Sequence, residues 1–531
     1  MTTPPTDSFS SQAPGAAQAE NAALKAGAAE KETFSYQPLL GLEMEMVPVD
    51  AITGASLPVQ AYFDTLLDIK RARGQAGEPI FLAGRCVGVS TRQAECGLDN
   101  GFNLLETALA PVQGGRGGLD RLARASYQEL ADSLQALKAD GACVLNASQH
   151  PACARDNSWY ERVCVPRPIY HELRGHRGWH HWEGIDAKAQ NGANTSVPVE
   201  QAVRALNVAV ALASASIALF ANSPLESGQP AGYKENRMTL WPRMFGPAHF
   251  PGDLFLSTYP ARAFHDLADF FGWMFGRGTV TRGLPMQASY DYKSVPVVIL
   301  DGAPSLLEFL QSPQWPGRRA DTGEAVSLQP QAQHVEYSQI GQFLDARLRY
   351  RLGRLPALED IMRAWRREGG LESLFLTSGA QTYIEARAPG AIFADAALLE
   401  EAGVDVARSA LLSPSALQAG LLGNLDEAWR LVTDTGWREL GSLRLPAMRA
   451  GIEDARVKAL CADVLAVARS GLDDDDRRWL AYPEFVLAGG RCAADRQLDT
   501  WMAAKGGEAQ KQAALLARHA ALHPARFGAG A

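Results

Sequence analysis

The residues of this chain best suited to chemistry are two glutamates, Glu43 and Glu45, in the otherwise apolar stretch 40–49. If this stretch is a strand, side-chain alternation places both carboxylates on one face, roughly 6–7 Å apart. Neighbouring carboxylates raise each other's pKa, and a nucleotide-bound Mg²⁺ or Mn²⁺ between them relieves the repulsion. The pair therefore predicts a metal site. The alternative is an exposed edge strand with two solvated carboxylates.

Two further segments place carboxylates in strand-like surroundings. Glu106 lies among apolar neighbours, and in residues 382–387 the two-residue period puts Glu385 and Arg387 on one face. Taken singly, each has a structural alternative, an exposed carboxylate or an ion pair along one strand. Together, four strand carboxylates and an arginine suit phosphoryl transfer. The carboxylates bind cations that bridge the phosphates, and the arginine guanidinium stabilises the negative charge that develops on the transferred group. The chain has neither a GxxxxGK[ST] loop nor a GxGxxG after a strand, so a nucleotide would be held without these glycine cradles.

Alternating strand-like and helix-like patterns must position these residues. We expect strands at residues 38–49, 80–90, 102–109, 142–148 and 382–387, and helices at residues 58–74, 119–140, 199–221, 303–311 and 357–369. Gly141 is expected to close the second of these helices. Residues 392–525 are almost entirely helical in pattern. Residues 1–33 are poor in large apolar side chains and predict a disordered tail, followed by a single catalytic domain over residues 34–531.

Composition and charge restrict the function classes. The 531 residues carry a net charge of −8 without a basic block, so nucleic acids and anionic membranes are poor partners. The longest apolar run, residues 206–221, is short for a bilayer span and favours a buried helix. No secretory signal is visible, and seven cysteines without a CxxC pair indicate neither a zinc site nor a disulfide framework. We expect a cytoplasmic protein with small-molecule substrates, and homo-oligomerisation stays open.

Several other residues invite a functional interpretation. Lys188 is a candidate phosphate contact, with an exposed lysine as its alternative. Adjacent histidines on a strand point to opposite faces, so His180 and His181 are not expected to share one ion. His181, Arg174 and Arg177 are candidate contacts of nucleotide or substrate. Cysteine nucleophilic catalysis is disfavoured, because no Cys-His-Asn arrangement is apparent and free cysteines are usually small buried groups.

Longer motifs join these residues into a recognisable set. They are Gly41-x-Glu43-x-Glu45, Glu106 followed by Pro111, residues 219–224 followed by Gly228, Gly232, Arg237 and Trp241, and Tyr383-Ile384-Glu385-x-Arg387. This set resembles the glutamate–cysteine ligase family of the plant and proteobacterial type, also called the carboxylate–amine ligases. The corresponding family patterns are GxExE, a strand glutamate before a proline, LFANSPF with G-x-x-S-x-R-x-x-x-W, and Y-[LI]-E-x-R. The resemblance spans roughly residues 36 to 500, and the combination is far more specific than any single motif.

The resemblance implies a glutamine-synthetase-like α+β fold, a curved antiparallel sheet surrounded by helices, with a helical C-terminal region. Members bind ATP and metal ions, activate a carboxylate as an acyl phosphate, and let an amine displace the phosphate. Hard oxygen ligands without a Cys/His cluster also point to Mg²⁺. The expected site has Glu43, Glu45, Glu106 and Glu385 as metal ligands, Arg387 and Arg237 as catalytic residues, Lys188, Asn194 and Arg387 as ATP contacts, and Arg237, Trp241 and Tyr383 as substrate contacts.

Three departures from the family pattern fall in segments expected to contact substrate or phosphate. Glu235 stands where the family commonly has serine, Gly379 stands where an arginine is common, and only Asn194 matches the usual Q-V-N or H-V-H strand. The sequence therefore predicts an ATP- and Mg²⁺-dependent ligase, with glutamate and cysteine as the favoured substrates. The alternatives are the same chemistry on another acid or amine, an ammonia ligase, and a non-catalytic binding protein of the same fold.

Overall fold

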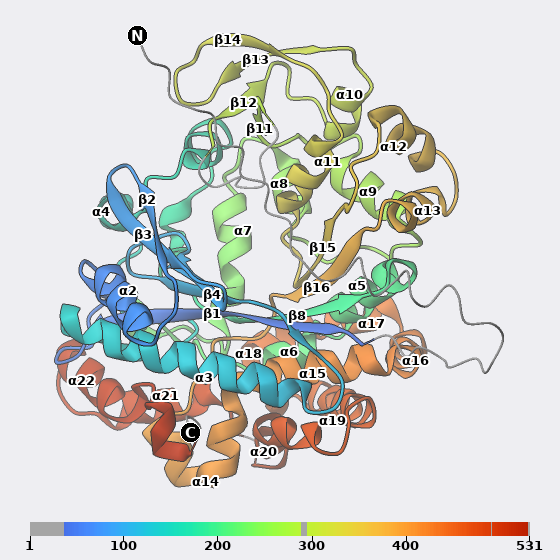
Figure 1. The fold of residues 1–531 in the computed structure, drawn as a ribbon. Coiled ribbons are helices and arrows are strands. Elements are labelled where there is room, and N and C mark those ends of the chain that lie inside the picture. The colour runs from blue at the N-terminus through green and yellow to red at the C-terminus, as the bar shows by residue number, and fades with distance from the viewer. Residues whose placement is uncertain (1–36, 288–294, 490, 529–531) are drawn as a thin grey trace. The chain divides into compact units, whose positions relative to one another are not determined.

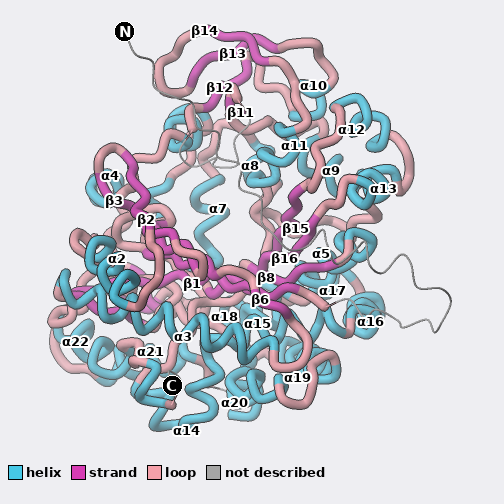
Figure 2. Tube along the Cα trace, in the orientation of Figure 1, coloured by secondary structure: helices cyan, strands magenta, loops and turns pink. Residues whose placement is uncertain are grey.

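The computed structural model describes residues 37–287, 295–489 and 491–528. The main feature of these residues is a ten-stranded antiparallel sheet with the order β15-β16-β8-β1-β5-β4-β3-β2, in which β6 and β7 pair with the two ends of β1 (Figures 1 and 2). The strands are β1 (Leu39–Asp50), β2 (Glu78–Leu82), β3 (Arg85–Ser90), β4 (Ala94–Leu98), β5 (Leu105–Leu109), β6 (Val112–Gln113), β7 (Ala142–Leu145), β8 (Asn191–Val197), β15 (Ala346–Arg351) and β16 (Gln381–Ala386).

Strand β1 is central and sets the two faces of the sheet. Its residues Leu42, Met44 and Met46 are buried in the main hydrophobic core, so the alternation of side chains turns Glu43 and Glu45 to the opposite face. A one-residue slip of register would drive both glutamates into that core, and burial therefore fixes the register strongly.

Helices cover the core face of the sheet. In Figure 1, α3 (Gly118–Ala136) and α15 (Ser413–Gly423) run beneath the strands. Gln418 of α15 donates hydrogen bonds to the carbonyls of Ala193 on β8 and Ile384 on β16, both 3.0 Å, and so ties this layer to two strands. The other helices of the C-terminal region are α14 (Ala396–Ser409), α16 (Leu425–Thr435), α17 (Trp437–Ser442), α18 (Arg444–Ala450), α19 (Ala455–Ser470), α20 (Ala481–Gly489), α21 (Ala493–Ala503) and α22 (Glu508–His519).

A second group of elements lies on the glutamate face, above the large sheet in Figure 1. Its helix α7 carries Trp241 and Met244. The group contains α7 (Leu240–Phe245), α8 (Pro251–Phe255), α9 (Leu267–Phe275), α10 (Leu306–Leu310), α11 (Gln333–Ser338), α12 (Leu358–Trp365), α13 (Gly370–Thr377) and a four-stranded sheet of β11 (Leu284–Pro285), β12 (Val297–Leu300), β13 (Trp315–Arg319) and β14 (Ala325–Leu328). The remaining elements are α2 (Tyr62–Ala72), α4 (Asn157–Val163), α5 (Ala202–Ala211), α6 (Ala213–Leu219), β9 (Leu225–Glu226) and β10 (Gln229–Pro230).

The predicted fold class, a large antiparallel sheet with helices around it and a helical C-terminal region, is confirmed. Gly141 follows the helical segment with φ 65°, the left-handed geometry that glycine tolerates at a helix end. The helix predicted at residues 199–221 is divided into α5 and α6 at Leu212. The prediction of a disordered tail at residues 1–33 falls outside the described residues.

No single helix among the described residues is long and apolar enough to cross a membrane. Val199–Ala211 and Ala213–Leu219 meet the length and composition test as a pair bent by 46°, and their apolar side chains are mostly buried within the fold.

Candidate active site

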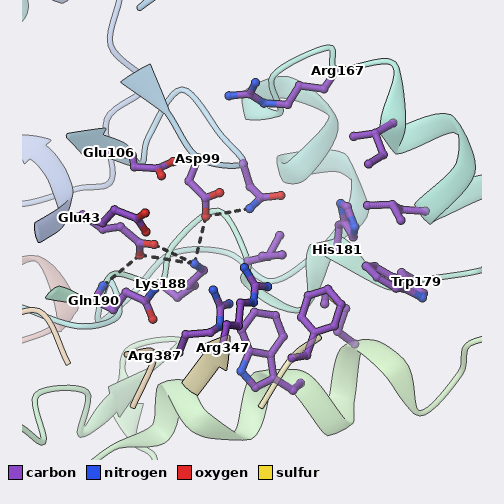
Figure 3. Close-up of a pocket in the computed structure, with 18 of the residues that line it drawn as sticks. Glu43, Asp99, Glu106, Arg167, Trp179, His181, Lys188, Gln190, Arg347 and Arg387 are labelled. Atoms are coloured by element: carbon purple, nitrogen blue, oxygen red, sulfur yellow. Dashed lines mark hydrogen bonds and ion pairs between the residues drawn. The ribbon is translucent and has the colours of Figure 1, made fainter. Parts of the chain in front are cut away.

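A cavity lies on the glutamate face of the large sheet (Figure 3). Charged side chains of both signs line it, together with apolar and aromatic ones such as Trp241. The acidic residues are Glu43, Glu45, Asp99, Glu106 and Glu385, and the basic residues are Arg167, Lys188, Arg282, Arg347, Arg349 and Arg387. The structure thus gathers the four predicted metal ligands in one hollow, with four other predicted site residues, Lys188, His181, Trp241 and Arg387.

The glutamates of β1 and β5 concentrate negative charge at one part of this cavity. Glu45 and Glu106 are direct partners in the antiparallel register, where like charges destabilise a sheet. Burial, reinforced by Glu385 and Glu106, raises the pKa of Glu43. Burial also raises the pKa of Glu45 to about 7. A bound cation would relieve both the repulsion and the lost hydration.

Lys188 joins two of the acidic residues. Its ammonium lies 3.3 Å from Glu45 Oε1 and 3.0 Å from Asp99 Oδ2 (Figure 3), and the Gln190 backbone N–H donates to Glu45 Oε2 at 3.0 Å. Burial lowers the pKa of Lys188, but Asp99 and Glu45 outweigh it, and the net shift is upward. The exposed lysine considered as an alternative is therefore wrong, because the side chain is buried and charged.

Glu385 of β16 has the opposite electrostatic environment. Its carboxylate is 3.3 Å from Arg347, 3.6 Å from Arg349 and 3.0 Å from Arg387. Burial raises the pKa of this carboxylate, but the three arginines lower it by a larger amount. The net shift is downward, so the carboxylate is ionised. Arg387 keeps a buried Nε without a hydrogen-bond partner among the described residues. Glu385 and Arg387 thus place a carboxylate that can bind a cation directly beside a guanidinium that can bind an anion.

Arg347 and Arg349 line the cavity but were not predicted from the sequence. The signal was present, because β15 reads Ala-Arg-Leu-Arg-Tyr-Arg and the two-residue period places its arginines on one face. Asp99 and Arg282 were also missed. They lie outside the long periodic segments, so no local pattern marks them.

Arg237 is not among the residues that line the cavity, although its motif predicted a catalytic and substrate-binding residue. The side chain is buried, and its Nε donates to Glu235 Oε1 at 2.8 Å. Its other nitrogens donate to the carbonyls of Arg387, Ala388 and Pro389 at 2.9–3.3 Å. The guanidinium is thus engaged within the protein and holds the segment that follows β16.

Asn194 and Tyr383 border the carboxylates without lining the cavity. Asn194 Nδ2 is 3.5 Å from Glu43 Oε1, and Asn194 pairs with Glu385 in the β8–β16 register. Tyr383 lies opposite Arg349 in the β15–β16 register. Both residues are placed to orient the charged groups, and their predicted direct contacts with ATP and substrate stay predictions.

The departures from the family pattern have structural counterparts. Glu235, in place of the usual serine, supplies the carboxylate that pairs with Arg237, and its Oε2 accepts the Asn222 N–H at 2.7 Å. Gly379 has φ 66° just after α13, where a side chain would be strained. His181 lines the cavity from a short 3₁₀ turn rather than a strand, whereas His180 stacks on Trp182.

The acidic part of the cavity fits Mg²⁺ by the chemistry of its donors. No group of three or more His, Cys, Asp or Glu residues close enough to hold an ion is found in the described part of the chain. Mg²⁺ usually takes one or two carboxylates and completes its shell with phosphate oxygens and water. Glu43, Glu45 and Glu106 provide oxygen ligands of this kind beside the arginines and lysine that suit a polyphosphate.

Comparison with known families decides the assignment. Glutamate-cysteine ligase family 2 (GCS2) matches residues 39–513, which is most of the chain. The chain belongs to this family. It is therefore a ligase, as its motifs predicted, and the matched region contains all the predicted site residues.

Solved structures give remote likenesses. A glutamate–cysteine ligase from Francisella tularensis, crystallised in complex with AMP, is 11% identical with a TM-score of 0.43, and the match covers 91% of this chain and 88% of that one. A bifunctional glutathione synthetase from Pasteurella multocida is 14% identical with a TM-score of 0.36, and the match covers 92% of this chain and 53% of that one. No curated protein matches the sequence.

Proposed function

We propose that this ligase uses ATP to join the γ-carboxylate of glutamate to an amine, with cysteine as the favoured amine, through an acyl phosphate. One observation carries the proposal. Four carboxylates from three strands, Glu43, Glu45, Glu106 and Glu385, meet Lys188 and Arg387 in a single cavity. A site for a carboxylate, a triphosphate and divalent cations needs both charge signs at close range.

The reaction has two displacements. The glutamate carboxylate attacks the γ-phosphorus of ATP, which forms the acyl phosphate and releases ADP. The amine nitrogen then attacks the acyl carbon, loses a proton, and expels inorganic phosphate. No protein nucleophile is required, so the side chains act by positioning and electrostatics.

Individual residues have distinct parts in this scheme. Arg387, held by Glu385 at 3.0 Å, presents its free Nε to the transferred phosphate. Lys188, fixed between Glu45 and Asp99, offers a buried ammonium to another anionic oxygen. Because these groups are oriented before the substrates arrive, little reorganisation is needed as charge develops.

Mg²⁺ ions would each be held by one or two of Glu43, Glu45, Glu106 and Glu385, and when bound they would neutralise phosphate charge. Without it, Glu43 and Glu45 are buried acids with raised pKa values. The carboxylates bind such ions only when they are ionised. The charged state of Glu43 and Glu45 therefore depends on bound Mg²⁺.

The alternative is the same chemistry on another acid or amine. It is supported by the engagement of Arg237 with Glu235, which removes an expected substrate contact, and by the aromatic lining of Trp179, Trp241 and Phe343. Cytoplasmic location, homo-oligomerisation and the absence of nucleic-acid and membrane partners stay predictions.

The decisive experiment measures ADP release with ATP, Mg²⁺ and a panel of amino acids, with products identified by mass spectrometry. Glu43→Ala and Glu385→Ala should lower turnover at least about 100-fold, the typical loss when a preorganised electrostatic group is removed. The matched control is Glu95→Ala, which removes an exposed strand glutamate outside the cavity and should leave turnover unchanged. Near-wild-type turnover in a folded Glu43→Ala or Glu385→Ala variant would contradict the assignment.

A further inference from the structure

One lining residue of the cavity, Arg282, is a buried cation that the proposed reaction leaves unused. Its side chain is only 5% exposed. Its two terminal nitrogens, Nη1 and Nη2, have no hydrogen-bond partner among the described residues. An unpaired buried charge is costly unless something supplied from outside pairs with it.

Aromatic side chains hold this guanidinium in place. Its Cζ lies 4.1 Å from the centre of the Trp179 ring and 5.3 Å from that of Phe343. The Trp179 indole N–H donates to Asp253 Oδ2 at 2.8 Å, so the ring itself is anchored. Stacking on the Trp179 ring fixes the plane of the Arg282 guanidinium, and its N–H groups point outward within that plane.

A second arginine supports this arrangement. Arg177 donates to the carbonyls of Val280 and Thr281, at 3.1 and 3.0 Å, and so fixes the backbone that leads into Arg282. The Arg177 charge is matched by ion pairs with Glu172 and Asp253. These carboxylates are engaged by Arg177, and within the described part of the chain the terminal nitrogens of Arg282 have no hydrogen-bond partner.

His181 contributes a further donor beside the same ring. Burial lowers its pKa to about 3, so the imidazole is neutral. Its Nδ1 lies 2.9 Å from the Tyr160 hydroxyl, and its Nε2 is buried without a partner in the described part of the chain. When the hydroxyl donates to Nδ1, the tautomer carries its proton on Nε2. His181 and Trp179 have ring centres 6.1 Å apart, and the Arg282 charge contributes to the low pKa of His181, so the two groups are within electrostatic range of each other.

Apolar side chains of one hydrophobic cluster surround Trp179 in this part of the cavity. Leu173, Ile185, Trp241 and Met244 are part of its lining. In Figure 3, Trp179 and His181 lie on the right and Glu43 and Gln190 on the left, and the centre of the Trp241 ring, 5.5 Å from Arg387 Cζ, borders the arginine that pairs with Glu385. A metal-bound polyphosphate is expected at the acidic end, and a carboxylate on an apolar body fits the aromatic end.

We propose that Arg282 and His181 bind a carboxylate of one substrate, whose body is apolar or aromatic and packs against the Trp179, Trp241 and Phe343 walls. This rests on the proposed ligase function and identifies the class of one of its substrates. The carboxylate accepts two N–H bonds from the guanidinium and one from the imidazole. It remains chemically unchanged during the reaction and serves only for binding and orientation.

The test uses pairs of compounds that differ by one carboxylate: glutamate and 4-aminobutyrate, cysteine and cysteamine, and phenylalanine and 2-phenylethylamine. Each compound is titrated calorimetrically and assayed for ATP consumption with wild-type protein and with Arg282→Gln. We expect one carboxylated member to lose on the order of 10- to 100-fold in affinity and in kcat/KM in the variant, as for charge-assisted hydrogen bonds, while its decarboxylated partner changes less than about threefold. Tighter binding of phenylalanine than of cysteine to wild-type protein would support the aromatic body and replace cysteine as the favoured amine of the proposed reaction, and weaker binding would exclude the aromatic body.

Matched controls separate charge, geometry and folding. Arg262→Gln removes an exposed arginine that pairs with Asp269 and should leave all affinities unchanged. Arg282→Lys keeps the charge without the fork and should restore only part of the selectivity. Equal losses for both members of every pair, no loss in any pair, or a loss confined to ATP would overturn the proposal. If no compound sustains ATP consumption, the proposed function fails, but carboxylate-selective binding lost in Arg282→Gln would still support this subsite.

Discussion

Replacing Arg237 with alanine tests whether this residue is part of the framework or contacts substrate. The guanidinium neutralises the fully buried Glu235 and donates to three consecutive carbonyls after β16. Removing it leaves a buried carboxylate without its counter-ion and leaves carbonyls of Arg387, Ala388 and Pro389 without these donors. The variant should therefore lose stability first, and any change in activity should follow from displacement of Arg387.

The magnitude follows from the buried ion pair. Breaking such a pair by removing one partner costs about 3–5 kcal/mol. A chain of about 500 residues has an unfolding entropy near 1 kcal/mol per kelvin, so the melting temperature should fall by about 3–5 °C. Burial raises the pKa of Glu235 even beside Arg237. Without Arg237 the pKa of Glu235 rises further, so the buried carboxyl is protonated more readily at low pH. The loss of stability should therefore be smaller at pH 5 than at pH 8.

The assay combines thermal unfolding at several pH values with steady-state kinetics. Arg237→Ala is compared with the double variant Glu235→Gln/Arg237→Ala, in which the uncompensated charge is also removed. We expect the double variant to recover a large part of the lost melting temperature and to lack the extra dependence on pH. Double-mutant comparison isolates the pair interaction because the two side chains are in direct contact.

The opposite result would refute this reasoning. It would consist of a melting temperature within about 1 °C of wild type, together with a KM for one substrate raised by more than tenfold. Arg237 would then bind substrate directly, as the sequence motif suggested, and its hydrogen bonds to the backbone would be dispensable.

Two further predictions concern stability away from the cavity. The Lys70 ammonium is buried between Glu129 and Asp132, at 2.7 and 2.8 Å. Lys70→Met should therefore lower the melting temperature by about 3–5 °C, and adding Glu129→Gln should restore part of that loss. An unchanged melting temperature in Lys70→Met would show that the ion-pair cluster is not needed for stability. Burial lowers the pKa of His150 to about 4, below its unfolded value of about 6.5, so its stabilising contribution is complete above pH 6.5 and is lost as the pH falls toward 4. His150→Gln should therefore flatten the melting-temperature profile between pH 7 and 5, and a profile parallel to wild type would exclude this contribution.

The sequence predicted side-chain direction best where a strict two-residue alternation coincided with a buried strand face. Glu43, Glu45 and Glu385 were placed correctly on their strands because alternation fixes the face of every residue once the apolar face is buried. The arginines of β15 follow the same rule and could have been found. The β1–β5 pairing that sets Glu45 opposite Glu106 depends on contacts between segments 61 residues apart in sequence, since 106 − 45 = 61, and no local pattern specifies it.

Arg237 and Arg282 show the limit of inference from residue type. Both are arginines in segments without strong periodicity, and the sequence favoured the first and passed over the second. Whether a guanidinium is engaged or available depends on what packs around it, here Glu235 in one case and the Trp179 ring in the other. That information arises only when distant segments come together.

The sequence by itself determined the strand faces, the helical C-terminal region, the set of strand glutamates and the family, because each is encoded by local period or motif. The tertiary structure alone decided that Lys188 is buried between two carboxylates, that Arg237 holds backbone, and that the Arg282 terminal nitrogens have no hydrogen-bond partner among the described residues. The reason is physical: side-chain period is a property of consecutive residues, whereas burial and charge pairing are properties of neighbours in space.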